Sequence, residues 1–159
     1  HTIGRRQRQM CIRDRSMSYI YHSGYGYSTR LCKSVASWFI NKYYPRHKIT
    51  LDIIHRGMKR EGCLGYCDTT GGWFRPRDFE IEIDTHLDKE TYTKTLLHEM
   101  FHMKQFIDGT LKTKWSKMYY KNEPVENYSY DDQPHEIAAR EAEETLYKKY
   151  HEERLESVL

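Results

Sequence analysis

The sequence contains no apolar run that approaches the roughly 20 residues needed for a membrane-spanning helix. Its first residues also lack the apolar segment of a secretory signal. Apart from Cys11 the cysteines are Cys32, Cys63 and Cys67, an odd number with no second pair to complete a four-cysteine zinc site. These absences predict a cytoplasmic protein with no membrane partner and no disulfide framework.

Positive charge is concentrated in the first 15 residues. Five of the 26 Lys and Arg residues lie there, but only one of the 23 acids, so the remaining chain has a net charge of −1. The string QMCIRDR in this segment resembles translated sequencing-adapter sequence. We therefore expect residues 1–16 to be a non-native or disordered basic arm and 17–159 to form a single domain. The alternative is a basic tail that binds nucleic acid, which we regard as the weaker reading.

Hydrophobic periodicity divides the chain into helices and strands. Apolar residues at helical spacing predict three helices, over residues 29–43, 88–108 and 132–155. Apolar alternation and β-branched residues predict three short strands, over 48–55, 64–69 and 79–84. We expect residues 18–29 and 110–132 to be irregular. Strands in one block with flanking helices predict an α+β domain with a small antiparallel or mixed sheet of about three strands.

The motif His98-Glu99-Met100-Phe101-His102 lies inside the second predicted helix. Residues four apart share one helix face, so both imidazoles can reach one ion. Glu99 lies about 100° around the helix, where it can reach a metal-bound water without being a ligand. Two neutral imidazoles and a carboxylate suit one catalytic zinc ion, so we expect Zn²⁺ as the cofactor. The alternative is a helix with surface histidines, which the apolar residues around the motif disfavour.

The last helix offers the third ligand. Glu136 is expected in its first turn, where the helix dipole favours an anion. His135 is the adjacent alternative, but its side chain should point about 100° away. Glu141, Glu143 and Glu144 are expected to form a solvated charged face.

Three stretches resemble those of small SprT-like or phage-encoded metallopeptidases: WFRPRDFEIEI (73–83), LLHEMFHMKQ (96–105) and PHEIAARE (134–141). An H-E-x-x-H motif followed by a helical glutamate also resembles the gluzincins. The resemblance implies a zincin-like minimal metallopeptidase domain, with Glu136 on a ligand-bearing last helix. It also implies that the strand carrying Phe79, Glu80, Ile81, Glu82 and Ile83 is the sheet edge that lines the substrate cleft.

The sequence departs from these groups at two points. Larger gluzincins carry an acid four residues after the ligand glutamate, where this chain has Arg140, so the group that orients His98 is unassigned. The four-cysteine zinc ribbon common in the SprT group is absent, which weakens a link to DNA-associated proteolysis.

The motif and the resemblance predict zinc-dependent hydrolysis of a peptide or protein substrate, with Glu99 as general base. Tyr128, Tyr130 and Arg140 are candidates for stabilising the transition state because they lie near Glu136 in the sequence. The alternatives are a non-catalytic zinc-binding or protein-interaction module, a nucleic-acid-associated protein that uses the basic arm, and a metal-dependent hydrolase of another substrate. Replacement of Glu99 separates the first alternative from an enzyme, and removal of the arm tests the second.

Overall fold

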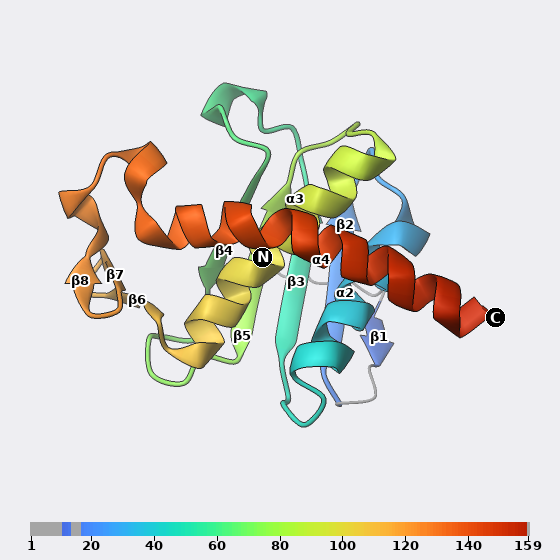
Figure 1. The fold of residues 1–159 in the computed structure, drawn as a ribbon, viewed down its shortest axis with the longest axis horizontal. Coiled ribbons are helices and arrows are strands. Elements are labelled where there is room, and N and C mark those ends of the chain that lie inside the picture. Colours follow the sequence, from blue (N-terminus) through green and yellow to red (C-terminus); the bar gives the residue numbers. More distant parts are fainter. Residues whose placement is uncertain (1–10, 14–16, 159) are drawn as a thin grey trace.

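The structure is a computed structural model that describes residues 11–13 and 17–158. Its described residues form a mixed α+β fold of three helices and two small sheets (Figure 1). The helices are α2 (Thr29–Tyr43), α3 (Lys89–Asp108) and α4 (Pro134–Val158). The strands are β1 (Cys11–Arg13), β2 (Tyr19–Gly24), β3 (Thr50–His55), β4 (Gly65–Thr69), β5 (Asp78–Ile83), β6 (Leu111–Lys114), β7 (Lys117–Tyr120) and β8 (Glu123–Pro124). Short 3-10 turns are η1 (Lys59–Glu61), η2 (Val125–Asn127) and η3 (Tyr130–Asp132).

The larger sheet has five strands in the order β1-β2-β3-β5-β4. Strands β2, β3 and β5 are parallel, whereas β1 and β4 pair antiparallel to β2 and β5. The predicted strand at 79–84 is therefore present as β5, but it is not an edge: Ile81 pairs with Ile53 on one side and with Cys67 on the other. The edge strand on this side of the sheet is β4, so the expectation that the strand carrying Phe79, Glu80, Ile81, Glu82 and Ile83 forms the cleft edge is wrong.

Local chemistry explains the starts of the three helices and the end of α3. Ser28 Oγ accepts a hydrogen bond from Leu31 N at the start of α2, and Asp88 caps α3 through Thr91 N. Helix α3 ends at Gly109, whose φ of 82° is the left-handed conformation of a helix C-cap. Pro134 occupies the first position of α4, where its missing N–H costs nothing. The three helices thus match their predicted ranges closely.

The core lies between one face of the larger sheet and the helices. Alternate residues of β3 and β5 are buried, and they pack with the apolar sides of α2 and α3. Helix α3 contacts β4 and β5 and also packs against α2 and α4. In Figure 1, α4 runs across the other helices, and the small β6-β7-β8 sheet lies beyond the amino-terminal end of α4. Helix α3 is therefore held between the sheet and the last helix.

Two segments differ from the sequence expectation. Residues 18–29 contain β2, because Tyr19, Ile20 and Tyr21 continue the parallel ladder with β3 despite the nearby glycines. Residues 110–132 contain the hairpin β6–β7 and the short β8 rather than only irregular chain. The prediction for the basic arm falls mostly on residues 1–10 and 14–16, which lie outside the described residues.

No helix in the described part of the chain is both long enough and apolar enough to cross a membrane.

Candidate metal centre

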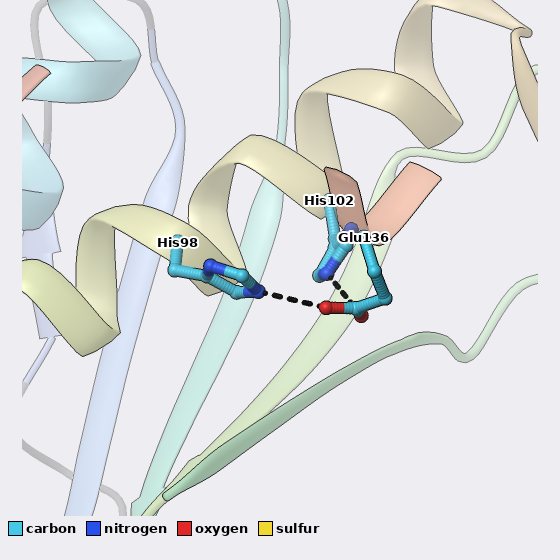
Figure 2. Close-up of side chains that lie close together, drawn as sticks. All are labelled: His98, His102 and Glu136. Atoms are coloured by element: carbon cyan, nitrogen blue, oxygen red, sulfur yellow. Dashed lines mark hydrogen bonds and ion pairs between the residues drawn. The ribbon is translucent and has the colours of Figure 1, made fainter. Parts of the chain in front are cut away.

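His98 and His102 of α3 and Glu136 of α4 meet at one point (Figure 2). One ligand atom from each residue can be chosen so that all three lie within 4.8 Å of one another. Ligands bound tetrahedrally at about 2.0–2.2 Å lie roughly 3.3 Å apart, so the spacing fits a single ion. The structure thus brings together the three residues expected as metal ligands.

His102 is held in one orientation by Gln105 from the next turn of α3. Its Nδ1 lies 2.8 Å from Gln105 Oε1, and Gln105 Nε2 donates to the main-chain oxygen of His135 at 3.1 Å. Because that carbonyl can only accept, the Gln105 amide must present its oxygen to His102. The proton then resides on Nδ1, and the lone pair of Nε2 is directed toward Glu136.

His98 is oriented in the same way by Glu143. His98 Nδ1 lies 3.2 Å from Glu143 Oε2, and the Glu143 side chain is only partly exposed. The expectation that Glu143 belongs to a solvated face is therefore wrong. Glu144 fits that expectation better, because its exposed carboxylate pairs with Lys94 at 2.7 Å.

The contacts around Glu136 require a positive charge between the three side chains. Glu136 Oε2 lies 3.2 Å from His98 Nε2, and Oε1 lies 2.8 Å from His102 Nε2. Within the described residues the buried His102 Nε2 makes no hydrogen bond, despite this short distance. An acceptor nitrogen facing a carboxylate is repulsive unless a proton or a metal ion lies between them.

The pKa values reflect this need. Burial disfavours the charged forms of His98 and Glu136, but the contacts among the histidines and the neighbouring carboxylates outweigh this effect. The histidines hold the pKa of Glu136 well below its usual range, while Glu136 and Glu143 raise the pKa of His98 to about 10. A metal ion at this position would replace the proton and would satisfy the same lone pairs.

Glu99 is buried beside the centre and is in contact with β4. Burial raises the pKa of its carboxyl group to about 7, against the lowering effect of His102 and His98. A Cβ added at Gly65 would lie 2.9 Å from Glu99 Cγ and 3.0 Å from Oε1. The absence of a side chain at Gly65 therefore gives Glu99 the space that it occupies.

These residues line a cavity of about 990 Å³. Helix α3 contributes His98, Glu99 and His102, while β4 and the loop before it form one wall. The hairpin β6–β7, the turns η2 and η3 and the start of α4 supply the remaining walls. The size is that of a site for part of a polymer or for a drug-sized molecule.

His135 is buried next to Glu136, but it is not among the three converging ligands. Its Nε2 lies 3.9 Å from Glu136 Oε1, and burial lowers the pKa of its ring to about 4. A neutral imidazole is thus placed at the cavity wall. Of the two candidates for a third ligand, the structure brings Glu136 to the histidine pair.

The three candidates for transition-state stabilisation lie in different places. Tyr130 and Arg140 line the cavity, whereas Tyr128 is absent from its lining and donates to Glu123 at 3.4 Å. Burial, with the negative charge of Glu136, raises the pKa of Tyr130. Arg140 donates to the main-chain oxygen of Asp131 at 2.7 Å, so it supports the turn that carries Tyr130.

The two groups that orient the histidines were not identified from the sequence. Gln105 could have been found, because it lies three residues after His102 on the same side of α3. Glu143 could also have been found, because it lies about two helical turns after Glu136 and therefore on nearly the same face of the helix, unlike Glu141 and Glu144. Its contact with His98 also depends on the packing of α3 against α4.

Comparisons with known proteins give no relative for this chain: no family model matches it, and no match was found among curated proteins or solved structures. They therefore lend no support to membership of the gluzincin or SprT-like groups. The interpretation of the centre rests on its own geometry.

Proposed function

We propose that this chain is a zinc-dependent peptidase in which His98, His102 and Glu136 bind the ion. The main support for this proposal is the orientation of the two imidazoles. Gln105 and Glu143 contact their Nδ1 atoms, so that both Nε2 atoms face Glu136. Outer groups of this kind are typical of histidine metal ligands. Two imidazoles and one carboxylate are the donor set of a catalytic zinc site that keeps a position open.

In this proposal Glu99 acts as the general base. A bound zinc ion would supply Lewis-acid chemistry, polarising a carbonyl and making a water more acidic. Glu99 accepts a proton from the attacking water while the oxygen of that water forms a bond to the carbonyl carbon. The same carboxyl group then gives that proton to the amine as the carbon–nitrogen bond breaks. Glu99 lines the same cavity as the three ligands, so a substrate bound there can exchange this proton with it.

The cavity walls favour a polypeptide as the substrate. Strand β4 pairs only with β5 in the described part of the chain, so its other edge carries main-chain groups free to bind an extended peptide. Gly65, at the start of β4, lies beside Glu99, and Tyr130 faces the same cavity. We propose that Tyr130 donates a hydrogen bond to the oxygen that gains charge in the transition state.

The replacement Glu99→Gln tests this function. The variant should retain one zinc ion per chain, because Glu99 is not a ligand, and it should lose hydrolysis of an unstructured protein such as casein by about 10²–10⁴-fold. Peptide release and metal content are measured on the same preparations. Equal hydrolysis by the variant would remove Glu99 from this role, and a zinc-loaded wild type that cleaves no peptide would favour a non-catalytic zinc module.

A further inference from the structure

In two segments, one that follows β4 and one that contains the hairpin β6–β7, all charged residues are basic. Residues 70–77 and 110–122 together contain six Lys and Arg residues and no acid: Arg75, Arg77, Lys112, Lys114, Lys117 and Lys121. The chain from residue 16 onward has a net charge of −1, so this concentration is not a general property of the protein. It marks a local surface with affinity for negative charge.

Contacts between side chains join the two segments into one surface. Lys114 Nζ lies 4.5 Å from the centre of the Trp73 ring, and Lys112 Nζ lies 5.9 Å from it. Both lysines lie on the same side of β6 because they are two residues apart. In the part of the chain that the structure describes, neither Lys112 nor Lys114 forms an ion pair with an acid. The nearest pair on this side is Lys117 with Glu126, at 3.6 Å.

The same surface exposes large aromatic side chains. Trp73 is 40% exposed, Phe74 is 68% exposed and Trp115, at the tip of the β6–β7 hairpin, is 84% exposed. Arg75 lies 5.4 Å from the centre of the Phe74 ring. We call Trp73, Phe74, Arg75, Lys112, Lys114 and Trp115 the basic aromatic surface. Exposed aromatic rings among bases are typical of a binding surface rather than of a solvated one.

This surface continues the path of a peptide bound along β4. Gly65 lies beside Glu99, and the strand leads away from it to Thr69, after which the chain enters the loop that carries Trp73. Five residues of strand cover about 16 Å. On the other side, Ser116 and Lys117 of the hairpin line the cavity. A polymer leaving the cavity along β4 therefore meets the basic aromatic surface about five residues from the reacting bond.

We propose that the basic aromatic surface binds an acidic stretch of the polypeptide substrate, about five residues from the bond that is cleaved. This inference rests on the proposed peptidase function, and it names the substrate class. Arg75, Lys112 and Lys114 supply charge complementarity, and the exposed rings supply apolar contact to side chains between the acids. A polypeptide is favoured over nucleic acid or lipid because the unpaired edge of β4, which leads to this surface, offers main-chain hydrogen bonds that fit an extended peptide.

The test measures binding separately from cleavage. Glu99→Gln protein is titrated into a fluorescein-labelled 12-residue peptide that carries four Asp or Glu residues, and into the same peptide with Asn and Gln in their place. The acidic peptide should bind about tenfold more tightly. The difference should shrink as salt is raised, since the surface is exposed.

Charge reversal locates the binding. The changes Lys112→Glu and Lys114→Glu, made together, should abolish the preference for the acidic peptide while zinc content and circular dichroism stay unchanged. The matched control is Lys148→Glu with Lys149→Glu, an equal change of charge at exposed positions of α4, which should keep the preference. Equal effects of the two double variants would overturn the proposal.

Other partners give different results. Tighter binding of a single-stranded oligonucleotide of equal charge, or of vesicles with 30% phosphatidylserine, would overturn the assignment to polypeptide. Equal binding of the acidic and neutral peptides would do the same. Binding is measured with Glu99→Gln protein, so it does not depend on cleavage. Failure of the wild type to cleave any peptide would count against the proposed function, whereas failure of the Glu99→Gln protein to prefer the acidic peptide would count against the surface alone.

Discussion

The lone pairs of two imidazole Nε2 atoms define the centre at the scale of single residues. His98 and His102 were predictable from their spacing, because one helical turn brings both rings to the same side. Their orientation depends on Gln105 and Glu143, which lie at helical spacings from His102 and Glu136, but the contact of Glu143 with His98 requires the packing of α3 against α4, which the sequence does not specify. Metal affinity should therefore depend on residues that do not touch the ion.

The replacement Glu143→Gln tests this dependence. It keeps the shape of the side chain but removes the charge that orients His98, so zinc affinity should fall about 10–100-fold. The matched control is Glu144→Gln, because Glu144 is exposed and pairs with Lys94 rather than with the centre. Competition with a chromophoric chelator measures both affinities, and equal affinities for the two variants would contradict the assignment of Glu143.

At the scale of elements, the short strand β4 forms the sheet edge beside Glu99, although nothing in its residues distinguishes it from β5 as the edge. Both β4 and β5 were predicted as strands, but their order in the sheet depends on pairing between distant residues. The alternation of acidic and apolar residues in β5 resembles an edge strand. The structure shows instead that Glu80 and Glu82 lie on the partly exposed face of an internal strand.

The replacement Gly65→Ala tests the fit between β4 and α3. The new Cβ would lie 2.9 Å from Glu99 Cγ, closer than atoms tolerate, and the flexible carboxylate must move. Hydrolysis should fall about a hundredfold, because a displacement of about 1 Å has that effect on a catalytic group. Zinc content should not change.

Gly57→Ala is the matched control for this replacement. The nearest atom to its new Cβ is Tyr25 Oη at 3.6 Å, an ordinary contact. Steady-state kcat/KM of the two variants is compared with that of the wild type. A Gly65→Ala enzyme as active as Gly57→Ala would show that Glu99 has more room than the structure indicates.

At the scale of the whole molecule, a buried histidine links stability to pH. His55 at the end of β3 bonds to the Ser23 carbonyl and to the Tyr92 hydroxyl, and its ring stacks on Tyr27 at 3.5 Å. Burial lowers its pKa to about 4. In the unfolded chain the same ring has a pKa of about 6.5. The stabilising contribution is thus complete above about pH 6.5 and is lost as the pH falls toward about 4.

Urea unfolding of the wild type and His55→Gln, in excess chelator at pH 7.5 and pH 5, measures this contribution. Lowering the pH from 7.5 to 5 should reduce the free energy of unfolding of the wild type by about 2 kcal/mol more than that of the variant. The reason is that pH 5 lies about 1.5 units below the pKa of the unfolded histidine, so the unfolded chain binds the proton and the folded chain does not. The replacement leaves His22 and His135 in place, so their contributions cancel in the comparison. The same loss in both proteins would show that His55 is protonated in the folded state.

Metal analysis measures whether α3 and α4 together hold one zinc ion. The protein is loaded with zinc, dialysed and analysed by mass spectrometry of the metal, beside His102→Ala and the control His86→Asn, which changes an exposed histidine outside α3 and α4. We expect one zinc ion per chain in the wild type and in His86→Asn, and none in His102→Ala. A wild type without zinc, or equal zinc in all three proteins, would contradict it.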